Sequence, residues 1–246
     1  DAIAFGHNAN ANAAETIAFG ANSNAQADSA IAIGFNSFAN QNSATAVGRF
    51  ASATANQTIA LGYYANADAN QGIAIGDQAL ANDPCSMAIG SQSEATGDRS
   101  IAIGFSAFAS GENAAAVMVD SQAVGRNSLA FGQSSIARSD NSFAVGVDAQ
   151  ATAVDAYAIG AGTKATHRNT FAMGAYANAE QVNAFAVGPN SLASGDNAYA
   201  IGPNAKATGV NSFALGPNAQ AVGNDSFAMG VGSIADGASA FALGDF

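Results

Sequence analysis

Large apolar, small and polar residues recur along this chain with a period of 14. Seventeen of the 18 positions spaced 14 apart from Gly6 are glycine, and the exception is Met118. We call these positions the anchors. Two residues before the anchor stands Ala in all 18 repeats, and five residues after it stands Ala in all 17 repeats that extend so far. The residues one and three before the anchor are large and apolar, except Thr45 and Ala115. No insertion or deletion interrupts this order, so the chain is one array of repeats.

The spacing within each repeat predicts strands and tight turns. Small and large residues alternate at Ser212, Phe213, Ala214 and Leu215, which is the period of two that is typical of a β-strand. Two helical heptads would also give a period of 14. Glycine recurs in almost every repeat, however, and each Gly inside a helix costs ~1 kcal/mol. We therefore expect a strand before the anchor, a turn at the anchor, a second strand three to six residues after it, and a second turn.

These units predict an all-β fold, a parallel β-roll solenoid of about 18 fourteen-residue coils. Each strand would pair with the identical strand one repeat away at ~4.8 Å, which gives a rod of ~80 to 85 Å. Glycine suits the first corner because it adopts a positive φ without cost. At Met118 we expect a distorted or bulged corner, or else a turn type that tolerates Met.

The second corner carries a column of asparagines, for which we expect a stacked ladder of side-chain amides. The column comprises Asn113, Asn127, Asn141, Asn169, Asn183, Asn197 and Asn211.

The alanine columns indicate which side of the coil is inside. Residues that stay small in every repeat are explained by enclosure, so we expect them to face the interior. The large residues one and three before the anchor then point outward as a continuous apolar stripe. A soluble monomer seldom exposes such a stripe, and other copies of the chain are its natural cover, although periodicity does not distinguish two copies from three. The expected interface residues are Ile3, Phe5, Ile31, Ile33, Ile59, Leu61, Ile101, Ile103, Leu129, Phe131, Phe143, Val145, Phe171, Met173, Phe213, Leu215, Phe241 and Leu243.

The stripe changes character along the chain. Isoleucine dominates the position three before the anchor in residues 1–118, and Phe or Tyr dominates it in residues 119–246. We expect one repeat domain over 1–246 whose symmetry axis is lined by Ile in the first sub-region and by aromatic residues in the second.

Charge and chemistry exclude several classes of function. The 246 residues carry a net charge of −11 with only seven Lys and Arg, which argues against a nucleic-acid partner. No apolar run approaches the ~20 residues of a membrane span, so we expect no membrane insertion by this segment. His7 and His167 lie 160 residues apart and Cys85 has no partnering base, so we predict no catalytic site. Aspartate recurs too irregularly for a calcium β-roll, and no regular Thr array suggests ice binding, so we expect no metal and no cofactor.

Adhesive contacts, if the chain makes them, should use aromatic side chains in the variable columns, because exposed aromatic residues are favoured in recognition. The opposing interpretation is that each such residue only caps a subunit contact. The candidates are Phe35, Phe38, Phe50, Tyr63, Tyr64, Phe105, Phe108 and Tyr176.

The repeat resembles a known family. The segment 127–132, Asn-Ser-Leu-Ala-Phe-Gly, followed by Ser135 and repeated at 141–146 and 211–216, is similar to the Asn-Ser-Val-Ala-Ile-Gly...Ser motif of YadA-like heads in trimeric autotransporter adhesins. The resemblance covers the entire chain. It implies a left-handed β-roll, a homotrimer, and display at the tip of a fibre on the outer membrane of a Gram-negative bacterium.

The resemblance also implies a function. Heads of this family bind host matrix proteins such as collagen or other cell-surface receptors, or mediate autoagglutination. The aromatic residues that replace the first aliphatic position in later repeats depart from the motif, and no stalk or anchor sequence is present, so we expect a head fragment whose ligand is its own. The alternative is a structural spacer in a surface or phage fibre that holds another binding domain away from its base.

Overall fold

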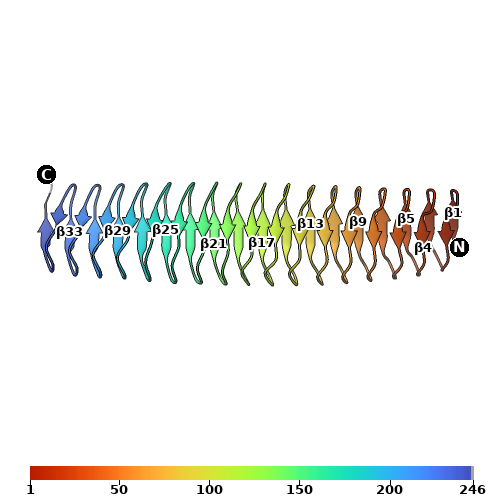
Figure 1. Cartoon of the computed structure of the whole chain (residues 1–246), viewed down its shortest axis with the longest axis horizontal. Coiled ribbons are helices and arrows are strands. Elements are labelled where there is room, and N and C mark those ends of the chain that lie inside the picture. Colours follow the sequence, from red (N-terminus) through yellow and green to blue (C-terminus); the bar gives the residue numbers. More distant parts are fainter. Residues whose placement is uncertain (245–246) are drawn as a thin grey trace. The chain divides into compact units, whose positions relative to one another are not determined.

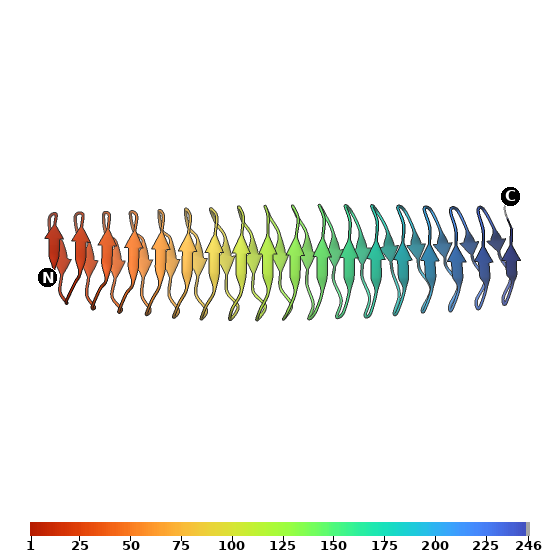
Figure 2. The same cartoon turned by 180° about the vertical axis from the view of Figure 1, so that it is seen from behind.

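The computed structural model describes residues 1–244, and the chain divides into two compact units, Asp1–Ala123 and Val124–Phe246. Each unit consists of short strands joined by tight turns, and Figures 1 and 2 show the coils of each unit following one another with a strand on either side of the coil. Odd-numbered strands precede the anchor and even-numbered strands follow it.

The first unit contains β1 to β18. Its odd strands are β1 (Ile3–Phe5), β3 (Ile17–Phe19), β5 (Ile31–Ile33), β7 (Thr45–Val47), β9 (Ile59–Leu61), β11 (Ile73–Ile75), β13 (Met87–Ile89), β15 (Ile101–Ile103) and β17 (Ala115–Val117). Its even strands are β2 (Asn10–Ala11), β4 (Asn24–Ala25), β6 (Phe38–Ala39), β8 (Ser52–Ala53), β10 (Asn66–Ala67), β12 (Leu80–Ala81), β14 (Glu94–Ala95), β16 (Phe108–Ala109) and β18 (Gln122–Ala123).

The second unit contains β19 to β35. Its odd strands are β19 (Leu129–Phe131), β21 (Phe143–Val145), β23 (Tyr157–Ile159), β25 (Phe171–Met173), β27 (Phe185–Val187), β29 (Tyr199–Ile201), β31 (Phe213–Leu215), β33 (Phe227–Met229) and β35 (Phe241–Leu243). Its even strands are β20 (Ile136–Ala137), β22 (Gln150–Ala151), β24 (Lys164–Ala165), β26 (Asn178–Ala179), β28 (Leu192–Ala193), β30 (Lys206–Ala207), β32 (Gln220–Ala221) and β34 (Ile234–Ala235).

Strand register follows the repeat. In both units every strand pairs in parallel with the equivalent strand of the next coil, at an offset of 14 residues, so that Ala60 lies opposite Ala74. The all-β parallel solenoid predicted from the period is confirmed, with about 17 rather than 18 coils, because the even strands number one fewer than the odd strands in the described residues. The left-handed sense stays a prediction.

The interior consists of methyl groups and short hydroxyls. Ala60 and Ala67, which represent the two alanine columns, have no exposed surface, and the same holds for their equivalents in all but the end coils. The prediction that alanine faces inward is therefore confirmed. Buried Ser or Thr at about half of the turns adds hydrogen bonds that the pattern did not indicate: the Ser23 Oγ donates to the Gly20 carbonyl at 2.8 Å, and the Thr58 Oγ1 donates to the Ala55 carbonyl at 2.7 Å. In turns such as these the hydroxyl satisfies a turn carbonyl inside the coil, whereas the buried hydroxyls of Ser86, Ser128, Ser191, Ser212 and Ser226 have no hydrogen-bond partner among the described residues.

Both corners of the coil are four-residue β-turns. At the first corner the Ala9 N–H donates to the Gly6 carbonyl at 3.2 Å, and at the second the Ala30 N–H donates to the Ala27 carbonyl at 3.0 Å. The third residue of each turn has a positive φ, for example 55° at Asn8, and a positive φ at the third but not the second residue is the type II pattern. Asparagine is common there because it tolerates this conformation.

The expected amide ladder forms at the second corner. In the second unit the Asn183 Nδ2 donates to the Asn197 Oδ1 at 2.9 Å, and the Asn197 Nδ2 donates to the Asn211 Oδ1 at 3.0 Å. The ladder continues with the Asn211 Nδ2, which donates to the Asp225 Oδ1 at 3.0 Å. Each of these asparagines thus occupies the αL position of its turn and also donates a hydrogen bond to the next coil.

The anchor glycines are required for two reasons. Gly34 has a φ of +127°, and a Cβ added there would lie 2.5 Å from the carbonyl oxygen of Gly48 in the next coil. A larger residue at Gly34 would therefore be strained in φ, and it would press on the backbone of the next coil unless that corner adjusts.

Met118 does not produce a bulge, so that expectation was wrong. The Met118 N–H donates to the Ile103 carbonyl at 2.7 Å and the Ser121 N–H donates to the Met118 carbonyl at 3.4 Å, which are the bonds of an ordinary first corner. The distortion is confined to a φ of 99°, below the 115° to 149° of the anchor glycines. The alternative, a turn type that tolerates Met, describes the corner.

We expect Met118→Gly to raise the free energy of unfolding by about 1 kcal/mol, because the gain from relieving a positive φ exceeds the entropy that glycine costs. Urea unfolding monitored by circular dichroism measures the change. Met118→Ala is the control, since it removes the same side chain but retains the Cβ, and it should give no gain. Equal effects of the two variants would contradict the assignment of strain to this residue.

Candidate functional site

The outward face of the odd strands is apolar in both units. In the first unit Ile59 and Leu61 are 40% and 43% exposed on either side of the buried Ala60. All the interface residues expected from the sequence lie on this face, in strands β1, β5, β9, β15, β19, β21, β25, β31 and β35. The even strands differ, because their outward residues include polar and charged side chains such as Asn66, Glu94 and Lys164 as well as apolar ones.

In the second unit the outward stripe contains an aromatic ladder. From Phe143 to Phe241, eight rings at the position three before the anchor lie one coil apart, with successive centroids separated by 4.9 to 6.3 Å. Parallel in-register pairing places identical columns side by side, so the rings stack face to face in much of the ladder, as at Phe171 and Phe185. The ladder remains partly open to solvent, since Tyr157 and Tyr199 are 41% and 40% exposed. Each unit thus presents a long apolar strip, and neither its own corners nor its even strands cover it.

Five residues at first corners form a second feature, which we call the corner cluster: Phe35, Arg49, Phe50, Tyr63 and Tyr64. The Phe50 ring stacks on Tyr64 with centroids 4.7 Å apart, and it meets Phe35 edge-on at 5.6 Å. Tyr63 contacts Tyr64 at 4.6 Å. Four of the eight predicted binding residues therefore come together in one place.

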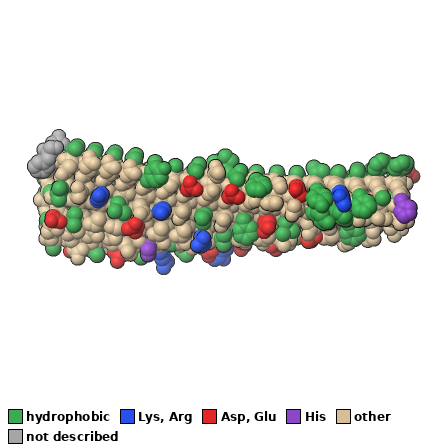
Figure 3. Space-filling model, turned by 45° about the horizontal axis from the view of Figure 1, so that its top comes forward, with side chains coloured by type: hydrophobic (Ala, Val, Ile, Leu, Met, Phe, Trp, Pro, Cys, Tyr) green, Lys and Arg blue, Asp and Glu red, His purple; other side chains and the backbone are tan. Residues whose placement is uncertain are grey.

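Arginine joins these rings, which the sequence had not indicated. The Arg49 guanidinium carbon lies 5.0 Å from the Phe50 centroid, 5.7 Å from Phe35 and 5.8 Å from Tyr63, within the range of cation–π attraction. Figure 3 shows a gathering of hydrophobic side chains with a basic group among them near the N-terminal end of the chain. The signal that could have found it is the run of Phe, Arg and Tyr in one column of three consecutive repeats.

The other candidate residues lie apart from this cluster. Phe38 and Phe108 are half-buried on the outer faces of β6 and β16, and Phe105 is exposed at a first corner. Within residues 1–244 no ring contact joins Phe105 to Phe108, or Phe38 to the corner cluster. Tyr176 is 67% exposed, and its ring covers Gly162, where an added Cβ would come within 2.7 Å of the ring atoms.

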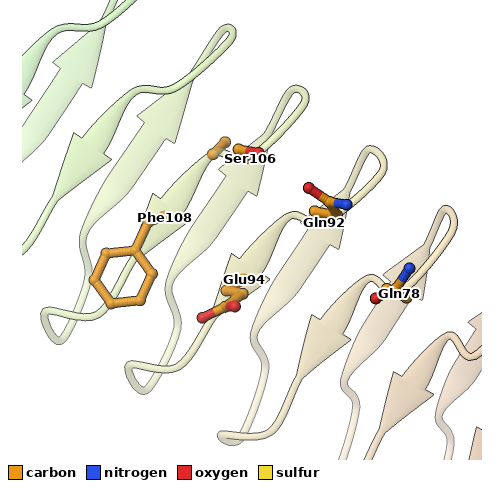
Figure 4. Close-up of a pocket in the computed structure, with 6 residues that line it drawn as sticks. Gln78, Gln92, Glu94, Ser106 and Phe108 are labelled. Atoms are coloured by element: carbon orange, nitrogen blue, oxygen red, sulfur yellow. The ribbon is translucent and has the colours of Figure 1, made fainter.

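A shallow hollow of about 380 Å³ lies beside the first corners of the first unit. It is lined by Gln78, Gln92, Glu94, Ser106, Ala107 and Phe108. Figure 4 shows Gln78, Gln92 and Ser106 in successive coils near the corner, with Glu94 and Phe108 on the neighbouring even strands. Only Phe108 was among the residues expected from the sequence.

The titratable groups offer no assembled chemistry in the described part of the chain. His7 and His167 are exposed and belong to different units. The exposed Cys85 Sγ lies 3.1 Å from the Gln71 Oε1. No group of three or more His, Cys, Asp or Glu side chains in residues 1–244 could hold a metal ion, and none of these residues belongs to a helix long and apolar enough to cross a membrane.

Comparison with protein families matches the repeat over its full extent. The family model of the YadA head domain repeat matches residues 1–23, 25–51, 53–79, 86–107, 95–117, 123–149, 151–177, 168–191, 193–219 and 221–246. Met118, the one anchor that is not glycine, falls in a gap between two of these matches. No curated protein matched the chain.

Proposed function

Because the chain belongs to the YadA head domain family, an adhesin-type head, we propose that it is the homotrimeric head of a bacterial surface adhesin that attaches to a host matrix protein or cell-surface receptor. The family is non-enzymatic, and we assign no catalytic role to this chain. The head would be displayed outside the cell by a protein anchored in the outer membrane.

The outward apolar stripe carries this proposal. Large side chains such as Leu61 and Met173 remain 43% and 40% exposed in the single chain, although each contributes about 1.5 to 3 kcal/mol when fully buried. A contiguous strip of this kind marks an interface. Equivalent residues of identical chains would meet at equal heights around one axis, because the repeat has a constant length, and a cyclic arrangement closes without leaving a free strip. Three chains is the number that the family implies.

The two kinds of stripe define the proposed interior of the assembly. In sub-region 1–118 the axis would be lined by aliphatic side chains, and in sub-region 119–246 by the aromatic ladder. The corners and the even strands would then face solvent in all three chains. A trimer displays each corner feature three times, so weak individual contacts add to a larger avidity.

Attachment by the corners is tested by replacing Phe35, Phe50, Tyr63 and Tyr64 together with Ser. We expect the variant head, presented on beads, to lose most of its attachment to host cells, since the exposed rings are removed while the buried alanines stay unchanged. The same beads carrying a Phe38→Ser variant distinguish the corner from the even-strand face. Sedimentation of each variant must show an unchanged mass.

Full attachment by an intact corner variant would contradict adhesion through this cluster. It would support the spacer, in which the repeats only hold another domain away from the surface. The regular coils, with few irregular segments, are compatible with that simpler role.

A further inference from the structure

Two aromatic residues of the corner cluster occupy backbone positions that disfavour them. Phe50 and Tyr64 have φ values of 60° and 53°. The same position in neighbouring coils holds Asn36, Gln78 and Gln92, and amide side chains tolerate this conformation better than bulky rings do. The positive φ itself recurs at the third residue of the corner turns throughout the described chain, so the cost peculiar to this cluster is that of placing bulky rings there. The rings are thus held outward at the corner in spite of a local conformational cost.

The Arg49 guanidinium is available to donate hydrogen bonds to an anion. Its guanidinium carbon lies 5.0 to 5.8 Å from three ring centroids, and the residue remains exposed to solvent. Within the described residues it makes no ion pair, whereas Arg99 pairs with Asp98 and Glu112. The N–H groups along the edge of a stacked guanidinium match the two oxygens of a carboxylate.

The position and charge of the corner cluster favour a sugar over a peptide strand or nucleic acid as its ligand. A corner is a turn and not a strand edge, and the N–H groups of Phe50 and Tyr64 already donate to the preceding coil at 2.9 and 3.1 Å, so a peptide cannot add here as a strand. Nucleic acid carries a phosphate at every nucleotide and requires several cations, whereas the corner cluster contains one, Arg49. Exposed flat rings are well suited to the C–H faces of sugar rings, and a sugar with a carboxylate would also satisfy Arg49.

The column that holds Tyr64 continues into the polar hollow. Gln78 and Gln92 follow in the next two coils, at ~4.8 Å per coil, and Ser106 adds a hydroxyl. These groups can exchange hydrogen bonds with sugar hydroxyls, and Phe108 provides one more ring. The Glu94 carboxylate in the hollow would repel a second acidic sugar, so neutral sugar units suit this end.

We propose that the first corners of the first unit from Phe35 to Ser106, together with the adjoining hollow that Phe108 lines, bind a linear polysaccharide that contains both uronic acid and neutral sugars. One uronate carboxylate pairs with Arg49 while sugar rings lie on Phe50 and Tyr64, and a neutral unit occupies the hollow. This inference rests on the proposed attachment function and names the class of its ligand.

Hyaluronan oligosaccharides, which alternate a uronic acid with a neutral amino sugar, are the probe for calorimetry on the intact head. We expect Arg49→Gln and Tyr64→Gln each to raise the dissociation constant at least tenfold. Gln is the residue of the same column in the next coil, so Tyr64→Gln preserves the turn. Arg99→Gln and Tyr176→Asn are matched controls at other corners and should leave binding unchanged.

Three control ligands test whether binding depends on the carboxylate, on the neutral sugar units and on the sugar rings. Carboxyl-reduced hyaluronan should bind at least tenfold more weakly, polygalacturonate should bind more weakly because every unit is acidic, and polyglutamate should not bind. Equal binding of the reduced polymer or of polyglutamate, insensitivity to Arg49→Gln, or no hyaluronan binding would overturn the proposal.

Enzymatic removal of uronate-containing glycans from host cells distinguishes this proposal from the broader one. Attachment of the unmodified head should fall to the level of the Arg49→Gln variant. Attachment that is unaffected by glycan removal would refute the polysaccharide while leaving the adhesin function intact, and a head that never attaches to untreated cells would refute adhesion itself.

Discussion

Replacing Phe171, Phe185 and Phe213 together with Ser is expected to convert the proposed trimer into separate chains. All three belong to the aromatic ladder, where Phe171 and Phe185 stack at 4.9 Å. Each ring buried between chains contributes about 1.5 to 3 kcal/mol, so the triple variant loses roughly 4 to 9 kcal/mol per chain, and every 1.4 kcal/mol is a factor of ten in association. Sedimentation at several protein concentrations measures the change.

The same variant should keep its coils. The three phenylalanines point away from the interior, and Ala172, Ala186 and Ala214 beside them are fully buried in the single chain. The β-sheet signal in circular dichroism should therefore persist at concentrations where the chains separate. Leu192→Ser on the even strand β28 is the matched control and should not alter association. A triple variant that remains trimeric would show that the ladder does not face the axis.

The second large effect is expected at an anchor glycine. Gly34→Ala should lower the free energy of unfolding by more than about 3 kcal/mol, because a Cβ at this residue is strained by a φ of +127° and lies 2.5 Å from the Gly48 carbonyl oxygen. A shift of either backbone segment would disturb the bond from the Gly48 N–H to the Ile33 carbonyl, which measures 2.8 Å.

Gly232 provides the control for this substitution. It has a φ of +66°, but nothing lies within 4 Å of an added Cβ. Gly232→Ala should therefore lower the free energy of unfolding by only about 1 kcal/mol, because only the positive φ disfavours the Cβ there. Chemical unfolding of the two variants compares an anchor glycine, which has a φ of +127° and lies against the next coil, with a turn glycine in the αL region that has open space around an added Cβ. Losses of equal size would contradict the special requirement for glycine at the anchor.

The period of the sequence was sufficient for the fold because register depends on it alone. Once each strand pairs with its copy 14 residues away, Ala60 must lie opposite Ala74, and the alternation around it places Ile59 and Leu61 outside. The Asn197 ladder follows by the same rule. Properties shared by every repeat are thus predictable from one repeat.

Features that belong to single coils were less accessible. The position of Arg49 among Phe35, Phe50 and Tyr63 depends on side-chain rotamers at one corner, and the hollow beside Gln92 depends on differences between neighbouring coils. At Met118 the loss of glycine suggested a distorted or bulged corner, whereas the flanking hydrogen bonds retain the turn, as in the alternative that tolerates Met, and only φ changes.

The mass of the purified head in solution tests the central claim most directly. The claim is that the apolar face of the odd strands lies between identical chains. Light scattering coupled to size-exclusion chromatography should give three times the chain mass of 24.1 kDa, about 72 kDa, at micromolar concentration and below. A mass of 24.1 kDa for folded protein would leave the stripe exposed to water and would contradict the account.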